Sequence, residues 1–269
     1  MVTSSRPSIP TLFVAGMLLA AVGVLMVALR WTDGQGPSTA GPDTAVAPGT
    51  AVQVRSDEGF ALWGTDRHGK PLRWDACDTV RFVLNTADAP SGVEDDVRTA
   101  LAMLAQASGL DLVLEDRTLE RPDPRRPLVE RDGDGWRWRP VLIAWARPGE
   151  SELPLSALDR GVAIPVAVRD GDREALVTGQ VVMNAARTDL VAGFGDRSDA
   201  IGATLLHELG HALGLDHVDD VTQIMSADPG AGAVRLGDGD LAGLRAVGAA
   251  AGCNPAPDPG SGRVLLGIP

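Results

Sequence analysis

The amino-acid sequence predicts an α+β domain with a mixed, twisted sheet, preceded by a single membrane-spanning helix. Three observations lead to this expectation. Short β-branched runs alternate with helical patterns, one late helical stretch carries closely spaced histidines, and the first thirty residues hold an uninterrupted apolar run. Of the 269 residues, about 200 follow the apolar run and a linker, which is enough for one domain with a sizeable core.

The apolar run is Leu12–Leu29, flanked by Arg6 and Arg30. Its 18 residues exceed the core of an ordinary signal peptide, about 7 to 15 residues, and are just long enough to span a bilayer. We therefore expect residues 1–32 to be a short cytoplasmic tail and a transmembrane anchor. Small residues at 38–40 leave a cleaved signal peptide, and hence a secreted protein, as the alternative.

Residues 33–55 are rich in Gly, Pro, Ala, Ser and Thr and predict a flexible linker. We expect the folded domain over residues 56–254 and a C-terminal tail over residues 255–269. The only cysteines, Cys77 and Cys253, bracket this domain, and in an oxidising compartment they could pair; the alternative is two buried thiols. A disulfide would put the domain outside the cytoplasm, so the preferred topology is a single-pass protein of the cell membrane with an extracellular domain.

In the first half of the domain, the sequence predicts one strand, then a helix, then a second strand. The strands are predicted over Val80–Leu84 and Leu112–Leu114, and the helix over Val93–Ala107, where apolar residues recur along one face. Residues 117–140 are dense in Arg, Pro, Asp and Gly, a composition that predicts a long surface loop.

The second half predicts three more strands and two helices. Pro165 lies within one of the strands and has no amide hydrogen to donate, so that strand is expected at an edge of the sheet. We expect Ser198 or Asp199 to cap a helix that runs to Leu213, and a C-terminal helix over Gly239–Ala250. The expected strands are Val141–Ala146, Val162–Val168 and, as the last strand, Leu176–Met183.

The first of these two helices carries the motif HELGHALGLDH. On an α-helix His207 and His211 lie about 40° apart, so both imidazoles can reach one metal ion. His217 could join them only if the helix stops, and Gly214 is the expected stop because glycine adopts the left-handed conformation that ends helices. Three imidazoles leave one position of a zinc ion open to water, as in catalytic sites, and Glu208 is placed to act as general base.

The motif resembles HExxHxxGxxH, the signature of the metzincin metallopeptidases, and Ile224-Met225-Ser226 is similar to their methionine turn. Among metzincins, the chain is most similar to the matrixins. It contains no tyrosine, whereas astacin-like and serralysin-like members place a tyrosine near that turn. Two features depart from the matrixin pattern: Val218 stands where serine is usual, and no PRCGxPD-like cysteine switch precedes the domain.

This resemblance implies a zinc-dependent endopeptidase that hydrolyses peptide bonds of extracellular proteins or peptides. Its zinc ligands would be His207, His211 and His217, with Glu208 as the catalytic base and Met225 as an apolar floor beneath the metal. It also implies an edge strand that pairs with an extended substrate. The rival classes are an inactive zinc-binding module, which could discard the glutamate, and a hydrolase of non-protein substrates, for which the third histidine and the methionine are not expected.

The composition and charge of the chain limit which other cofactors and partners we expect. Matrixins commonly carry calcium, so the resemblance implies Ca²⁺ as a candidate second cofactor. The acidic runs at 132–135 and 238–240 lack the spacing of an EF-hand loop and are typical of turns. We therefore assign no calcium ligands. The fourth histidine, His68, is expected to be an exposed side chain. A net charge of -12, with Lys70 as the only lysine, argues against nucleic acid as a partner. We expect no organic cofactor.

Overall fold

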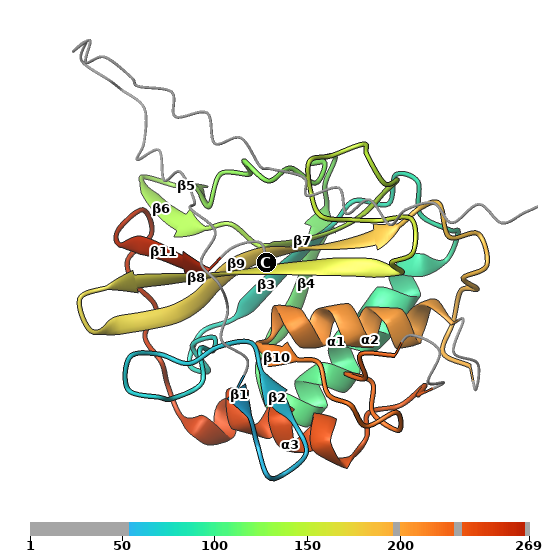
Figure 1. Ribbon diagram of the computed structural model, residues 1–269. Helices are drawn as coiled ribbons and strands as arrows, with labels where there is room; N and C mark the ends of the chain where they lie inside the picture. The colour runs from blue at the N-terminus through green and yellow to red at the C-terminus, as the bar shows by residue number, and fades with distance from the viewer. Residues whose placement is uncertain (1–53, 196–199, 229–232, 267–269) are drawn as a thin grey trace, which may run out of the picture. The chain divides into compact units, whose positions relative to one another are not determined.

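A six-stranded mixed sheet forms the middle of the domain (Figure 1). The computed structural model describes residues 54–195, 200–228 and 233–266 of the chain. The strands of this sheet are β3 (Val80–Leu84), β4 (Leu112–Arg117), β7 (Val141–Ala146), β8 (Gly161–Asp170), β9 (Arg173–Asn184) and β11 (Arg263–Leu266). Their order is β11-β8-β9-β7-β3-β4. The four strands from β9 to β4 run parallel, β8 is antiparallel to β9, and β11 is antiparallel to β8.

Two interior strands of the sheet match their predictions residue for residue. β3 and β7 have the bounds expected from their apolar runs. All six residues of β7, VLIAWA, are buried, as is usual for a parallel strand that is covered on both faces. The short strand expected at Leu112–Leu114 extends to Arg117 in β4, where the sequence turns polar because this strand lies at the edge of the sheet.

Three α-helices lie on one side of the sheet (Figure 1). They are α1 (Val93–Ser108), α2 (Ile201–Ala212) and α3 (Asp238–Val247), with α1 packed against both of the others. The helices predicted at Val93–Ala107 and Gly239–Ala250 are thus confirmed within a few residues, the second continuing into a short 3₁₀ turn at Ala249–Ala251. Helices together with a mixed sheet confirm the expected combination of elements, and one large apolar cluster fills the space between them.

The expectation of one long surface loop over residues 117–140 is wrong. β5 (Val129–Asp132) and β6 (Gly135–Trp138) form an antiparallel hairpin, with Gly133 at a φ of 57° in its turn. Arg126 is buried, with hydrogen bonds to the carboxylate of Glu120 and to oxygens of Thr178, Gly179 and Pro140. Paired charges and two separated apolar side chains, Leu128 and Trp138, hold this segment against the β8–β9 pair, so hydrophobic periodicity could not reveal it.

The C-terminal end of the fold also differs from the prediction. Leu176–Met183 lies within β9, but β9 is not the last strand, because β10 (Leu215–Asp216) and β11 follow it. Residues 255–269 were expected to form a tail, yet Arg263–Leu266 add a strand to β8. This short segment forms a strand because it pairs with β8, which lies about a hundred residues earlier in the sequence. A local pattern in the sequence therefore does not predict it.

A second, three-stranded sheet joins the N-terminal end of the described chain to the histidine-rich motif. β1 (Val54–Arg55) pairs with β2 (Ala61–Leu62), and β2 pairs with β10, which lies inside the motif. Arg55 also makes an ion pair with Asp219 at 2.5 Å. The linker was expected over residues 33–55. Its last two residues, Val54 and Arg55, therefore belong to the folded domain.

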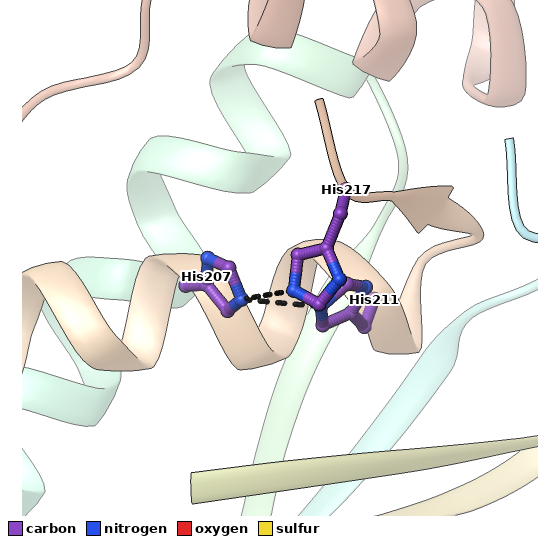
Figure 2. Close-up of side chains that lie close together, drawn as sticks. All are labelled: His207, His211 and His217. Carbon is purple, nitrogen blue, oxygen red and sulfur yellow. Dashed lines mark hydrogen bonds between the residues drawn. The ribbon is translucent and has the colours of Figure 1, made fainter. Parts of the chain in front are cut away.

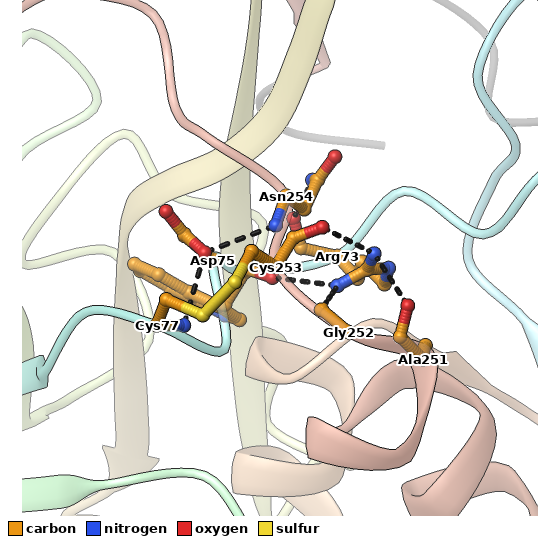
Figure 3. The surroundings of a disulfide bond; sticks show 8 residues. Arg73, Asp75, Cys77, Ala251, Gly252, Cys253 and Asn254 are labelled. Carbon is orange, nitrogen blue, oxygen red and sulfur yellow. Dashed lines mark hydrogen bonds between the residues drawn. A yellow bond between two sulfur atoms is a disulfide. The ribbon is translucent and has the colours of Figure 1, made fainter.

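The predicted disulfide is confirmed. Cys77 and Cys253 are bonded, with a Cα–Cα distance of 5.2 Å (Figure 3). The surrounding chain is held by Arg73, whose guanidinium donates hydrogen bonds to the carbonyl oxygens of Ala251, Gly252 and Cys253. The disulfide therefore fixes the segment that follows α3 to the segment that precedes β3.

The expected membrane anchor, Leu12–Leu29, and most of the linker lie outside the described residues. The described residues all lie within the unit Ala40–Pro269. Over residues 54–195, 200–228 and 233–266, none of the helices combines the length and apolar character that crossing a bilayer requires.

Candidate metal centre

Helix α2 presents two of the histidines from consecutive turns. It begins at Ile201 after Ala200, and the expected caps, Ser198 and Asp199, lie outside the described residues. The helix is buried over nearly its whole length, so its position is fixed by packing on the sheet and on α1. His207 and His211 therefore point to the same side of a rigid element, as the spacing of four residues predicts.

The helix stops where the sequence predicts. It ends at Ala212, and Gly214 has a φ of 108°, a conformation that strongly favours glycine. A Cβ at this position would also lie only 3.0 Å from the carbonyl oxygen of Leu72. The Trp74 indole donates a hydrogen bond to the Ala212 carbonyl, and the Trp63 amide donates one to the Gly214 carbonyl, both at 2.9 Å. The exposed carbonyls of the helix end are thus satisfied from the N-terminal segment.

Strand β10 brings the third histidine back to the helix. Leu215 and Asp216 pair with β2, which turns the chain over the end of α2. The amide of His217 donates a hydrogen bond to Asp216 Oδ1 at 2.7 Å, and the His217 side chain is 46% exposed. It is the most open of the three imidazoles and forms the outer side of the group.

The three imidazoles converge on one point (Figure 2). The Nε2 atom of His207 is 3.1 Å from that of His217, and the Nε2 atom of His211 lies 3.1 and 3.2 Å from the other two. Nitrogen atoms that bind one tetrahedral zinc ion at about 2.0–2.1 Å are separated by about 3.3–3.4 Å, close to this triangle. Lone pairs this close repel one another unless a cation lies between them, so the donor set fits a zinc ion.

Backbone carbonyls fix the tautomer of two of the rings. Nδ1 of His207 lies 2.7 Å from the Ile224 oxygen, and Nδ1 of His211 lies 2.9 Å from the Leu215 oxygen. A carbonyl only accepts, so each Nδ1 carries the proton and each Nε2 keeps a free lone pair. Burial lowers the pKa of His207 to about 4 and lowers the pKa of His211 well below its ordinary value. Burial also lowers the pKa of His217, so all three rings favour the neutral, metal-binding form.

Met225 lies directly beneath this part of the helix. A Cβ at Gly210 would be 2.6 Å from the Met225 sulfur, so the side chain occupies the space that glycine leaves on α2. Met225 is 2% exposed, and its carbonyl accepts a hydrogen bond from the amide of Val218 at 2.9 Å. The sequence-predicted methionine is therefore placed against α2 at Gly210, which lies between His207 and His211 in the sequence, and the turn that carries it also supplies the Ile224 carbonyl.

Asp240 holds this turn from α3. Its carboxylate accepts hydrogen bonds from the amides of Ile224 at 2.7 Å, Met225 at 3.1 Å and Gly237 at 2.8 Å. The side chain is 1% exposed, and burial raises the pKa of Asp240 above its ordinary value. In the sequence this residue belongs to an acidic run that resembles a turn, and nothing there shows that it supports the methionine turn.

Glu208 lies on the same helix and lines the same cavity as the histidines. It is 5% exposed, and a Cβ at Gly161 would come within 2.9 to 3.1 Å of its side chain, so the carboxylate packs against the first residue of β8. Burial, with a smaller contribution from Asp159, raises the pKa of Glu208 to about 8. A cation bound by the neighbouring imidazoles would favour the charged carboxylate and oppose this shift.

The cavity in front of the histidines has a volume of about 530 Å³. Three walls enclose it: α2 together with His217, residues 158–163 at and just before the start of β8, and the turn from Gln223 to Asp228. This volume is in the range of small-ligand and peptide side-chain sites. The site is thus a groove between a helix and a strand, with the metal ligands at its floor.

The structure places four of the residues that the sequence assigned to this site around one cavity: His207, Glu208, His211 and His217. The fifth, Met225, does not line the cavity but packs against α2 at Gly210. His68 is exposed on a turn, as expected. One further group of metal-ligand types is found among the described residues, Asp75 with the two cysteines, but the sulfurs are consumed by the disulfide. Sequence reasoning missed the supporting groups, which are Asp240, the carbonyls of Leu215 and Ile224, and the two tryptophans at the end of α2.

No protein-family model matches the chain, and no curated protein is significantly similar to it. What the site does is therefore inferred from its own residues.

Proposed function

We propose that the protein is a zinc-dependent endopeptidase of the matrixin-like metzincin type. The observation that carries the proposal is the convergence of three Nε2 atoms within 3.2 Å of one another, on the wall of a cavity that a buried glutamate also lines. Structural zinc sites normally use four protein ligands. Among the described residues only three histidines gather here, which suits a site that keeps one position for water.

The chain's own residues have distinct parts in the proposed reaction. His207, His211 and His217 would hold the zinc ion, which when bound acidifies water and polarises a carbonyl group. A carboxylate oxygen of Glu208 accepts the proton of the attacking water and passes it to the nitrogen of the leaving amine. The Ile224 and Leu215 carbonyls keep the imidazoles in the orientation that directs Nε2 into the cavity.

Strand β8 supplies a place for an extended peptide substrate. The amide of Asn184 donates a hydrogen bond to the Arg160 carbonyl, and in an antiparallel ladder the residues that bond to the partner alternate with residues that face away. The backbone N–H and C=O groups of Gly161 and Ala163, and the backbone C=O group of Pro165, therefore point away from β9. Pro165 has no amide hydrogen, which costs nothing at a position whose outer side pairs with no strand among the described residues. The edge position expected for Val162–Val168 is correct only for the first half of β8, because β11 pairs with the second half and is itself the edge strand. A peptide that adds to this edge passes the metal ligands.

The compartment follows from the disulfide and from the sequence of the N-terminal segment. The Cys77–Cys253 bond supports an oxidising environment. Together with the apolar run Leu12–Leu29, this favours a domain that faces the cell exterior and is tethered to the membrane, with secretion after signal cleavage as the alternative. Substrates would then be extracellular proteins or peptides.

The test is a Glu208→Gln variant of the full-length chain. Zinc content, measured by elemental analysis, is expected to match the wild type because the ligands are intact. Hydrolysis of a mixed peptide library is expected to fall by at least about a hundredfold, the usual contribution of a general base. Glu152→Gln, at an exposed position, is the matched control and should cleave like the wild type. A Glu208→Gln protein that cleaves at the wild-type rate would remove Glu208 from the mechanism.

The metal assignment is tested separately. His217→Ala is expected to lower the zinc bound per chain, while His68→Ala leaves it unchanged because His68 is exposed on a turn far from the other histidines in sequence. A chelator should abolish wild-type cleavage and added zinc should restore it. A wild-type protein that binds no zinc, or that cleaves no peptide when loaded with zinc, contradicts the proposed function.

A further inference from the structure

We infer that strand β11 closes one end of the substrate-binding edge and so limits how far a substrate extends on the N-terminal side of the bond that is cut. This inference rests on the proposed function and adds a substrate class to it: peptides cut near their N-terminus, or chains that can turn away from the sheet a few residues before the cut. It follows from which part of β8 is already paired.

The two edges of β8 are used differently. On one side β8 pairs with β9 along its whole length, from Gly161 to Asp170. On the other side β11 pairs only with the second half, through Ala167, Val168 and Arg169. Among the described residues, no strand pairs with the outer edge of the first half. That first half is the part that lines the cavity and touches Glu208.

β11 is firmly held in its place. Val264 packs into an apolar cluster that contains Val166, Val168, Ala175 and Val177 of the β8–β9 hairpin. The chain just before β11 is fixed by a two-bonded ion pair between Arg173 and Asp258, at 3.0 and 3.1 Å. A substrate strand would therefore have to displace a packed element to extend past Ala167.

The direction of β11 decides which end of the substrate is limited. β11 is antiparallel to β8 and its last described residue, Leu266, pairs with Ala167. A substrate strand that pairs with the first half of β8 on the same side as β11, and also antiparallel to β8, has its N-terminal end next to Leu266. Because Gly161 touches Glu208, the cut bond lies near the start of β8, which leaves room for about five substrate residues before β11.

The test uses the full-length protein and a series of peptides that share one cleavage site. The peptides carry from about two to about eight residues ahead of the cut bond, the range that spans the free edge. For the wild type, kcat/KM is expected to rise with length up to about five residues and then to stop rising or fall. One variant ends at Gly262 and lacks β11; for it, kcat/KM should keep rising, by about tenfold for the longest peptide, since two or three further backbone hydrogen bonds form.

A second variant displaces β11 without removing it. Gly262 has a φ of 81°, and a Cβ there would lie 2.5 Å from the Arg169 carbonyl oxygen, so Gly262→Ala should separate the start of β11 from β8 and shift the length profile in the same direction. Gly171→Ala is the matched control: its φ is 58°, but a Cβ there meets nothing within 4 Å. It carries the same kind of backbone strain and should keep the wild-type profile.

The outcomes separate this inference from the proposed function. If the wild type cleaves peptides but its length profile coincides with that of the variant ending at Gly262 and with that of Gly262→Ala, the inference about β11 is wrong and the peptidase stands. A limit found on the C-terminal side of the cut bond also overturns it. If zinc-loaded wild type cleaves no peptide of any length, the proposed function itself fails. The rate on the shortest peptide, together with the melting temperature, reports whether each variant is folded.

Discussion

Asp240 shows how much the candidate metal centre depends on a residue that is not one of the three converging histidines. It accepts three backbone hydrogen bonds, two of them from Ile224 and Met225, while the Ile224 carbonyl faces the Nδ1 atom of His207. A chain of direct contacts therefore runs from α3 through the methionine turn to the first ligand. At the scale of single residues, the geometry of the three imidazoles is set by such neighbours as well as by the motif.

Asp240→Ala is expected to destabilise the protein by about 2–4 kcal/mol, because it leaves buried amides without an acceptor. Zinc affinity should fall with it, since the Ile224 carbonyl is no longer fixed. Urea unfolding and zinc titration measure the two effects. Asp238→Ala changes an exposed aspartate in the first turn of the same helix and should cost well under 1 kcal/mol. Equal effects of the two substitutions would show that only helix α3 is affected, not the turn.

At the scale of elements, the β8–β9 hairpin is held at its turn by a group of charged side chains, Glu174 with Arg169 and Arg67, which form a charged clamp. Glu174 of β9 accepts hydrogen bonds from Arg169 of β8 at 2.6 Å and from Arg67 of the preceding loop at 2.7 Å. Burial on its own would raise the pKa of Glu174, but the two guanidinium groups outweigh it and hold the pKa below the ordinary value of 4.5. The charged clamp connects the turn of the β8–β9 hairpin, which lies at the opposite end from Gly161 and the cavity, to the loop that carries Arg67.

This clamp predicts a loss of stability in acid. A carboxyl group whose pKa is lower in the folded state stabilises the fold above its unfolded pKa, and that contribution is lost as the pH falls from about 4.5 through the folded value. Glu174→Gln should reduce this pH dependence and cost about 2 kcal/mol at pH 7, since the arginines are partly exposed. Urea midpoints at neutral and acid pH measure it, with Glu152→Gln as control. The same acid dependence in wild type and Glu174→Gln would contradict the assignment.

At the scale of the whole molecule, the disulfide connects the two ends of the folded domain. Cys77 precedes the first strand of the large sheet, and Cys253 follows the last helix, 176 positions later. Arg73 and Asn254 bind the backbone around the bridge, so the C-terminal segment leaves this point in a fixed direction toward β11. The long loop closed by the bridge removes many conformations from the unfolded chain.

Replacing both cysteines by serine is expected to lower the free energy of unfolding by about 5 kcal/mol, the value for a loop of this length in the chain-entropy model. Equilibrium unfolding of the double variant against the oxidised wild type measures the loss. Reduced wild type provides the control, because it lacks the bond but keeps both side-chain volumes. If the reduced protein and the double variant are as stable as the oxidised protein, the bridge contributes nothing to the fold.

The sequence by itself determined the local features. The bounds of β3 and β7 follow from short apolar runs, and those of α1 follow within one residue from apolar periodicity. The candidate metal ligands follow from a spacing of four residues on a helix and a glycine that ends it. These depend on residues that are neighbours in the chain, so a local pattern is sufficient to predict them. The disulfide could be proposed because only two cysteines exist.

Only the tertiary structure decided the remaining features. The hairpin within residues 117–140, the strand β11 in the expected tail, and the support of the methionine turn by Asp240 all depend on partners far away in sequence. Arg126 is buried because Glu120 and several carbonyl oxygens surround it, and β11 forms because β9 occupies only one side of β8, so that the other side can accept a further strand. Such contacts leave no periodic trace, since their free energy comes from groups that meet only after the chain has folded.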